Sequence, residues 1–291
     1  MVNIRVNIKD PTAPLSPAVR QLYSLLGKIY AFIFARPSMQ FVNNALLRLA
    51  LRGRGYDNFG DLTATGEHTF IKLLARFKPS LCIDVGANKG HYSHTLLEST
   101  TTKVIAFEPL PEAFKSLKML AAEFPGRLVA VDKGVGSENA ELDLYYGEAD
   151  SELASFSTEI NEIAHVGEAN KNRVKVPVVT LDTYFEHESR ALGAHEIDLL
   201  KIDTEGYEYE VLTGATDTIR KLRPKFIQIE YNWHQLFKMR SLYSFARLLD
   251  GYVPYQLLPY GSGLIKVDVR KPESNIYRYA NFVFVREDIK I

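Results

Sequence analysis

The stretch Leu81–Gly90 (LCIDVGANKG) is the most informative part of the sequence, because it combines an apolar strand with a glycine turn. Leu81–Val85 is apolar apart from Asp84, as expected for a strand that is covered on both faces of a parallel sheet. Gly86 and Gly90 follow where the strand turns directly into a helix, so a ligand can approach bare backbone there. This context predicts a ligand-binding strand-turn-helix unit.

Short apolar segments alternate with helical segments around this unit, which is typical of a parallel sheet with crossover helices. The predicted strands are Leu81–Val85, Lys103–Phe107, Leu128–Asp132, Val174–Thr180, Asp198–Asp203 and Lys225–Tyr231. The predicted helices are Glu67–Phe77, His91–Glu98, Glu112–Phe124, a turn after Gly206, Ala215–Leu222 and Gln235–Leu249. The antiparallel strands predicted at one edge are Tyr252–Leu258, Leu264–Asp268 and Asn281–Val285. We therefore predict an α/β fold with a mostly parallel sheet.

Composition excludes several classes of protein. Of the 291 residues 46% are hydrophobic and 24% are charged, and 35 basic residues balance 35 acidic ones. Neither disorder nor nucleic-acid binding through bulk charge is therefore expected. Cys82 is the single cysteine, which excludes an intrachain disulfide and fits a reducing, cytoplasmic compartment. We find no secretory signal, and the apolar stretch Ile29–Ala35 is shorter than the roughly 20 residues that a membrane-spanning helix needs.

The first 60 residues differ from the rest, so we divide the chain into a basic helical extension, 1–60, and a main domain, 61–291. Residues 12–55 contain no Asp or Glu but six Lys or Arg residues. Apolar residues at helical spacing predict two helices that are separated near Pro37. We expect these helices to cap the main domain or to form a homodimer contact. The alternative is peripheral contact of residues 15–54 with the anionic inner face of a membrane.

An acid after the second strand completes the predicted ligand site. Glu108 follows the strand Lys103–Phe107 and lies 22 residues after Gly86, about where an acid binds the ribose hydroxyls in nucleoside-binding folds of this topology. The turn lacks the third glycine of the dinucleotide-binding pattern, which argues against a nicotinamide cofactor. S-adenosylmethionine carries a ribose without a pyrophosphate, its carboxylate suits a helix N-terminus, and Asp84 would bind its ammonium group. The alternative is a plain turn, with Glu108 capping the helix that starts near Pro111.

Two later strands carry polar residues where a central parallel strand should be apolar. Alternation places Lys201 and Asp203 on one face of their strand, and it places Gln228 and Glu230 on one face of the next strand. Both acids fall at carboxyl ends, where open α/β sheets bind ligands. Because unpaired burial of such groups is unfavourable, they either pair in a structural network or face a polar ligand. His234 follows as a candidate proton acceptor.

These motifs resemble those of the FkbM-type S-adenosylmethionine-dependent methyltransferases. The matching elements span most of residues 62–287 and are Ile83–Ser93, Ala106–Pro109, and Leu200–Glu208 with Leu212, Gly214 and Ala215. The first element is widespread among class I methyltransferases, whereas Leu200–Glu208 is much more specific to this family. The resemblance implies a Rossmann-like class I methyltransferase sheet and O-methylation of a hydroxyl on a small-molecule acceptor, either a sugar or glycan or a polyketide-like compound.

The resemblance and the residue patterns together define the predicted site. The expected cofactor-binding residues are Asp84, Gly86, Ala87, Asn88, Gly90, Glu108, Pro109, Asp132 and Gly134. The expected catalytic residues are Lys201, Asp203, Glu230 and His234. Gly134 departs from the family pattern, in which a small nonglycine residue is frequent. The polar stretch Ser151–Lys171 is expected to form a loop or lid that helps to select the acceptor.

The predicted roles follow from the chemistry of methyl transfer to a hydroxyl. Asp203 and Glu230 would orient the acceptor hydroxyl and the cofactor amine, and Lys201 would hold both carboxylates. His234 or Asp203 would accept the hydroxyl proton. We expect no metal ion, and the alternative is a magnesium ion on Asp203, Glu230 and Asn232, as in catechol-type methyltransferases. The rival functions are a nicotinamide-dependent oxidoreductase and a noncatalytic, membrane-associated binding protein.

Overall fold

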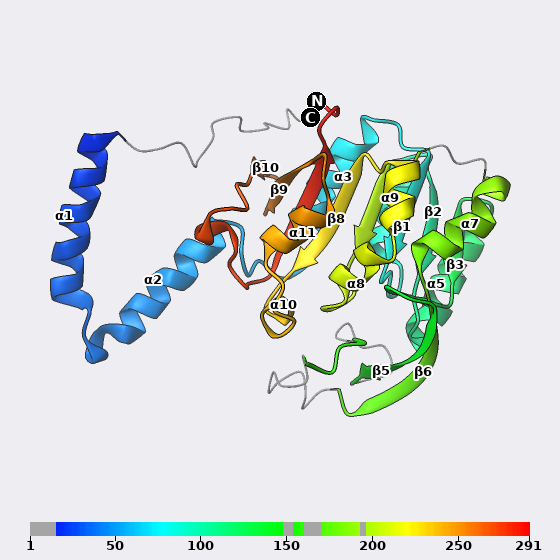
Figure 1. Cartoon of the computed structure of the whole chain (residues 1–291), viewed down its shortest axis with the longest axis horizontal. Helices are drawn as coiled ribbons and strands as arrows, with labels where there is room; N and C mark the ends of the chain where they lie inside the picture. The colour runs from blue at the N-terminus through cyan, green and yellow to red at the C-terminus, as the bar shows by residue number, and fades with distance from the viewer. Residues whose placement is uncertain (1–15, 148–153, 160–169, 193–195) are drawn as a thin grey trace.

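The computed structural model describes residues 16–147, 154–159, 170–192 and 196–291, and Figure 1 shows how its elements are arranged. A large sheet forms the centre of the molecule, a small sheet lies at the bottom of the view, and two helices extend to the left. The predicted lid, Ser151–Lys171, lies mostly outside the described residues.

The large sheet has eight strands, and five of them are parallel. Their order across the sheet is β10 (Gly263–Lys266), β9 (Tyr252–Leu258), β11 (Ala280–Arg286), β8 (Phe226–Tyr231), β7 (Leu199–Ile202), β1 (Leu81–Val85), β2 (Lys103–Phe107) and β3 (Leu128–Val131). Strands β8, β7, β1, β2 and β3 run parallel, whereas β11, β9 and β10 are antiparallel to their neighbours. The predicted fold, a mostly parallel sheet with an antiparallel C-terminal edge, is confirmed.

Helices cover both faces of this sheet. Alternate residues of a strand point to opposite sides, and apolar side chains on each side pack against helices. The helices on one face are α3 (Glu67–Ala75), α4 (His91–Ser99) and α5 (Pro111–Glu123), which pack against side chains that include Cys82 and Val104. The helices on the other face are α7 (Leu181–Leu192), α8 (Glu208–Thr213), α9 (Thr216–Leu222) and α11 (Leu242–Leu248), which pack against side chains that include Ile83 and Ile105. Every residue of β1 is therefore buried, Asp84 included.

The chain reverses its direction across the sheet at β1. It passes from β1 to β2 and β3 on one side and returns to β7 and β8 on the other. Val85 pairs with Phe107 of β2 and with Ile202 of β7, so the carboxyl ends of three strands lie together. Open α/β sheets bind their ligands at such a switch point. The topology alone therefore indicates a ligand site at the carboxyl end of β1.

The segment predicted as the strand Val174–Thr180 does not join the large sheet, so the prediction of its place was wrong. It forms β6 (Asn172–Val179), which is antiparallel to β5 (Ala140–Tyr146) in a three-stranded sheet that also contains β4 (Gly134–Val135). Lys175 is exposed while Val176 and Val178 are buried. This alternation is typical of a half-exposed antiparallel strand and not of a doubly covered parallel one.

The predicted helix Gln235–Leu249 is divided into two shorter helices. The first is α10 (His234–Phe237), and α11 begins only at Leu242. Met239 between them has a φ of 52°, which a helix cannot accommodate, and the Ser241 side chain accepts the Ser244 N–H as an N-cap. The break leaves α10 as a single turn beside the carboxyl end of β8.

The two predicted N-terminal helices are present as α1 (Pro17–Phe34) and α2 (Gln40–Gly53), but they do not cap the main domain. All residues of α1 are described and none of them is buried, whereas α2 buries only Leu51. In Figure 1, α1 stands apart from the body and is connected to it through α2. Across the described residues, no helix combines the length and the apolarity that crossing a bilayer requires.

Candidate active site

A pocket of about 790 Å³ opens at the switch point. Its walls come from the ends of β1, β2, β7 and β8, from the segment before α3, and from the small sheet. The predicted site residues that line it are Gly86, Ala87, Asn88, Glu108, Pro109, Gly134, Lys201, Asp203 and Glu230. The described lining does not include Asp84, Gly90, Asp132 or His234. The structure therefore brings most of the predicted residues together around one cavity.

The glycine turn packs directly on the end of β7. Gly86 has a φ of +77°, and its N–H and that of Ala87 both donate to the Phe107 carbonyl at 3.0 Å. A Cβ atom at position 86 would lie 1.7 Å from the Asp203 carbonyl oxygen, so only glycine fits here. Gly90 has a different role, because a Cβ atom there would meet Leu120 of α5 at 2.6 Å. Gly90 thus permits two helices to approach.

Glu108 connects the end of β2 to the glycine turn. Its carboxylate accepts the Asn88 N–H at 2.7 Å and the Leu110 N–H at 2.8 Å, and the residue is only 6% exposed. Burial raises the pKa of Glu108 to about 7, against the opposing effect of these two donors. A carboxylate has about four acceptor positions, so two stay available for ligand hydroxyls. Glu108 therefore both orders the turn and faces the pocket.

The raised pKa of Glu108 predicts that cofactor affinity depends on pH. An ionised carboxylate accepts hydrogen bonds from two ribose hydroxyls, so binding and ionisation of Glu108 favour each other. We expect the affinity for S-adenosylmethionine to increase as the pH rises through about 7, measured by calorimetric titration. In Glu108→Gln the affinity should be lower and this component of the pH dependence should disappear. An unchanged pH profile in the variant would contradict the assignment.

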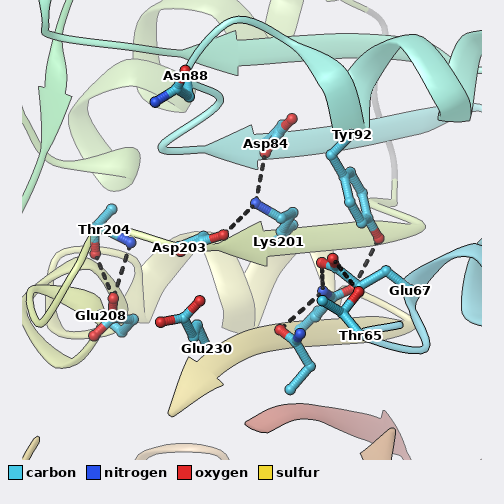
Figure 2. A network of polar contacts seen from close by, with 12 residues as sticks. Thr65, Glu67, Asp84, Asn88, Tyr92, Lys201, Asp203, Thr204, Glu208 and Glu230 are labelled. Carbon is cyan, nitrogen blue, oxygen red and sulfur yellow. Dashed lines mark hydrogen bonds and ion pairs between the residues drawn. The ribbon is translucent and has the colours of Figure 1, made fainter. Parts of the chain in front are cut away.

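Lys201 lies between two carboxylates in the floor of the pocket, as Figure 2 shows. Its Nζ is 3.1 Å from an Asp203 oxygen and 3.5 Å from an Asp84 oxygen. Asp84 is completely buried and also accepts the Ser93 hydroxyl hydrogen bond at 2.6 Å. Burial by itself would lower the pKa of Lys201, but the charges of Asp203, Asp84 and Glu67 outweigh it and raise the pKa. Asp84 is therefore the buried counter-ion of a permanently charged lysine.

Removing the charge of Lys201 should destabilise the fold. Lys201→Met keeps most of the side-chain volume but leaves Asp84 buried without a cation, so we expect the free energy of unfolding to fall by about 3 kcal/mol or more. Chemical denaturation measures this change. The matched control is Lys221→Met, because Lys221 forms an exposed ion pair with Asp217 and should matter little. Equal small effects of both variants would show that the buried cluster does not depend on Lys201.

A second polar group in the pocket, Glu67 in the first turn of α3, was missed from the sequence. Its carboxylate accepts hydrogen bonds from the Thr65 hydroxyl at 2.9 Å and from the Gln228 amide at 2.7 Å. Gln228 in turn accepts the Tyr92 hydroxyl hydrogen bond at 2.8 Å, which completes the network in Figure 2. Burial raises the pKa of Glu67. An acid in a first helical turn is too common to indicate a site.

The segment after β7 is ordered by Glu208, a residue of the family-specific block. Its carboxylate accepts the N–H groups of Thr204 and Gly206 at 2.9 and 3.1 Å, as well as the Gln235 amide at 2.5 Å. Burial raises the pKa of Glu208 to about 7. Because these bonds hold the tight turn that follows Asp203, Glu208 positions Asp203 at the pocket without lining the pocket itself.

Three carboxylates meet at the ends of β7 and β8. Oxygen atoms of Asp203, Glu205 and Glu230 lie within 4.8 Å of one another, close enough to share one divalent cation. Glu230 accepts the Asn232 amide at 2.5 Å, and burial together with the neighbouring carboxylates raises its pKa well above the ordinary value. Either a divalent cation or a proton on Glu230 would reduce the repulsion among these three carboxylates. Activity that is insensitive to a chelator would discard the magnesium alternative.

His234, the other candidate proton acceptor, does not belong to the described lining of the pocket. It is 1% exposed, and its backbone N–H donates to the side-chain oxygen of Asn232 at 2.8 Å. Its Nδ1 is 3.2 Å from a carboxylate oxygen of Glu205, which lies between the imidazole and the other acids of the cluster. Asp203, with 30% of its side chain exposed, is the more accessible base.

An apolar wall of the pocket comes from the small sheet and from residues after β5. Leu144, Ala154 and Phe156 line the pocket near Gly134. A Cβ atom at Gly134 would lie 2.5 Å from the Phe156 ring, so glycine permits this close packing. Asp132, which was predicted beside Gly134, does not belong to the described lining. Leu144 belongs to β5, whereas Ala154 and Phe156 belong to the stretch Ser151–Lys171 that was predicted to be a loop or lid.

The pocket lies beside a glycine turn at the switch point of the sheet, where open α/β folds bind their ligands. The sequence model of the methyltransferase FkbM domain matches residues 84–252, and the chain belongs to this family. The predicted family, the enzyme class and S-adenosylmethionine as the cofactor are thereby confirmed. The rival assignment to a nicotinamide-dependent oxidoreductase is set aside.

Two curated relatives match part of the chain. The hexuronic acid methyltransferase AglP of Haloferax volcanii is 26% identical over 167 residues, which are 56% of this chain and 62% of AglP. The 2-O-methyltransferase NoeI of Sinorhizobium fredii is 24% identical over 172 residues, 58% of this chain and 69% of NoeI. Among solved structures, the O-methyltransferase TomG of Streptomyces achromogenes is 12% identical, with a TM-score of 0.41 over 92% of this chain and 98% of that chain.

Proposed function

We propose that this chain transfers a methyl group from S-adenosylmethionine to a hydroxyl of a neutral sugar or glycan. The observation that carries the proposal is a single pocket with two kinds of wall: Glu108 and the glycine turn on one side, and the Asp203 and Glu230 carboxylates on the other. The names of AglP and NoeI, a hexuronic acid methyltransferase and a 2-O-methyltransferase, support a sugar hydroxyl as the acceptor.

The residues around the glycine turn fit the cofactor. Glu108 would accept the ribose hydroxyls, and the turn at Gly86 would leave backbone open to the amino acid part. Phe156 and Leu144 offer apolar surface that suits a purine base. When it is bound, S-adenosylmethionine supplies an electrophilic methyl group on a positively charged sulfur. The protein has only to orient the acceptor, exclude water and take up a proton.

The charge of the pocket argues for a neutral acceptor. The described lining contains six acidic residues, Asp61, Glu67, Glu108, Asp203, Glu205 and Glu230. It contains two lysines, Lys133 and Lys201, and the second is already paired with carboxylates. Burial raises the pKa of Glu67, Glu108 and Glu230, but the carboxylates of Asp61, Asp203 and Glu205 would still repel an anionic acceptor. Sugar hydroxyls can instead donate hydrogen bonds to this surface. The acid cluster therefore selects against hexuronates and phosphorylated sugars.

An aromatic cluster at the same pocket suits the apolar face of a sugar ring. The ring of Phe59 lies 4.6 Å from that of Tyr279 and 6.0 Å from that of Trp233, measured between centroids. All three residues line the pocket, and Phe59 is 54% exposed. Aromatic rings bury apolar C–H surface while the neighbouring carboxylates accept hydroxyl hydrogens. The pocket can therefore bind both the apolar face and the hydroxyl groups of a sugar.

Asp203 is the residue that we assign as proton acceptor. It lines the pocket, is partly exposed, and is held by Lys201 at 3.1 Å. As the acceptor oxygen gains its methyl group its proton becomes acidic, so a carboxylate in hydrogen-bonding reach can take it late in the reaction. Glu230, beside Asp203, would orient the same hydroxyl through a hydrogen bond.

The test of this function is methyl transfer from isotopically labelled S-adenosylmethionine to matched sugars. Neutral methyl glycosides and oligosaccharides should gain one methyl group on an oxygen, as read by mass spectrometry. The corresponding hexuronates should react at least about tenfold more slowly, because each brings a carboxylate into an acidic pocket. Transfer to no hydroxyl would overturn the proposal, and preference for the hexuronates would overturn the charge argument.

A further inference from the structure

Helix α1 exposes a broad apolar face that the rest of the described chain does not cover. Leu22, Leu26, Ile29 and Ile33 follow one another along this face at spacings of three and four residues, and each is about half exposed. The aromatic residues beside them that are also exposed are Tyr23, Tyr30 and Phe32. Isolated apolar residues are normal on a protein surface, but a continuous face of this length indicates a binding surface.

The opposite face of α1 is polar and basic. Arg20, Ser24 and Lys28 lie on it at successive turns, away from the apolar face. The other basic residues between positions 16 and 60 are Arg36, Arg48, Arg52 and Arg54, and all six cations of this stretch are exposed. Within the described residues no ion pair joins any of these six to an acid, and residues 12–55 contain no Asp or Glu.

The extension has a defined shape and is firmly joined to the body. At the corner between the helices, the Tyr30 hydroxyl donates to Asn43 at 2.7 Å, and the Asn43 amide donates to the Phe34 carbonyl at 3.0 Å. At the other end of α2, Leu51 and Tyr56 are buried in the main core. Figure 1 shows α1 held at a distance from the large sheet by this arrangement.

We propose that α1 and Arg36, at the corner after it, bind the surface of an anionic membrane. The apolar face would lie among the lipid headgroups and upper acyl chains, and the cations on the polar face would contact lipid phosphates. The competing partner for the same face is a second copy of this chain, in a homodimer. A twofold interface would bring two copies of an acid-free surface together and double its positive charge, whereas an anionic bilayer neutralises that charge.

Cosedimentation of the full chain with lipid vesicles tests this proposal. We expect binding to phosphatidylcholine vesicles that contain roughly 30% phosphatidylserine and much weaker binding to phosphatidylcholine alone. The variant Arg20→Glu with Lys28→Glu should weaken binding at least about thirtyfold, because two lost cations and two added anions face the lipid. The matched control is Lys72→Glu with Lys118→Glu, an equal charge change on the exposed surface of the body, and it should bind as the unmodified chain does.

A second variant tests the apolar contribution. Leu26→Asp with Ile29→Asp places charges in the middle of the apolar face and should abolish binding to all vesicles, while the melting temperature of the body stays unchanged. Absence of binding to anionic vesicles, or equal binding of both variants and the unmodified chain, would overturn the proposal. Light scattering that shows a dimer, lost in this variant, without vesicle binding would assign the face to a second copy instead. None of these outcomes depends on methyl transfer.

Discussion

Asp203→Asn is expected to reduce methyl transfer by at least about 100-fold while leaving the affinity for S-adenosylmethionine nearly unchanged. The amide has the shape of the carboxylate and can still accept a hydrogen bond from Lys201, whose Nζ lies 3.1 Å from Asp203. It cannot take up the hydroxyl proton. Because Glu108 and the glycine turn are untouched, the cofactor side of the pocket should be intact. Single-turnover kinetics measures the first effect, and calorimetric titration measures the second.

The control for Asp203→Asn is Asp250→Asn, the same chemical change at an exposed position after α11. This control should leave both turnover and cofactor affinity unchanged. Retained turnover in Asp203→Asn would remove Asp203 from the mechanism. Loss of cofactor affinity in parallel with turnover would instead show that Asp203 acts by ordering the turn, whose Gly86 packs on the Asp203 carbonyl.

Gly86→Ala should be the most damaging small substitution in the cofactor half of the site. The new methyl group would lie 1.7 Å from the Asp203 carbonyl oxygen, and the backbone at position 86 has a φ of +77° that alanine adopts with strain. The turn must move away from β7, so we expect the free energy of unfolding to fall by about 2 to 4 kcal/mol. Methyl transfer should fall by roughly 100-fold, because the turn positions the cofactor.

Gly126→Ala separates the two causes of this effect. Gly126 has a similar φ of +74°, but a Cβ atom there would meet nothing within 4 Å. This variant should lose about 1 kcal/mol of stability from backbone strain and keep its activity. Chemical denaturation and the labelled methyl-transfer assay compare the two variants. Equal losses in both would mean that the contact between Gly86 and β7 has no special importance.

The strands of the large sheet could be predicted because each is an apolar run and each run has clear boundaries. Leu81–Val85 and Phe226–Tyr231 are nearly continuous apolar runs, and each is bounded by turn residues or charges. Such runs are typical of central strands that helices cover on both faces of a mostly parallel sheet. The polar exceptions within them, Asp84, Gln228 and Glu230, then pointed to the polar centre, since burial of these groups requires partners.

The helices of the extension show where local pattern is insufficient. The spacing of Leu22, Leu26 and Ile29 predicts a helix with one apolar face, and α1 has that face. The same spacing would serve equally well for packing on the sheet, for a dimer or for lipid. We expected these helices to cap the body or to form a homodimer contact, and α1 buries none of its described residues against the body. Periodicity specifies the face of a helix and not what that face contacts.

Other parts of the site depend on long-range geometry for the same reason. Phe156 meets Gly134 next to a bridge between Ser155 and Tyr145 of β5, and Glu67 reaches Gln228 across 161 positions of the chain. Neither contact has a signature within a short window of sequence. His234 shows the reverse case, in which a residue with suitable chemistry lies at the expected end of a strand but packs inward with 1% exposure.

The sequence by itself determined the parallel sheet, the glycine turn and the acids at the strand ends, because strand burial and backbone conformation depend on neighbouring residues. Only the tertiary structure decided which groups share the cavity: Glu67 and Phe156 enter it, whereas Asp84 and His234 are enclosed behind it. The physical reason is that a side chain's solvent exposure depends on the packing of distant elements.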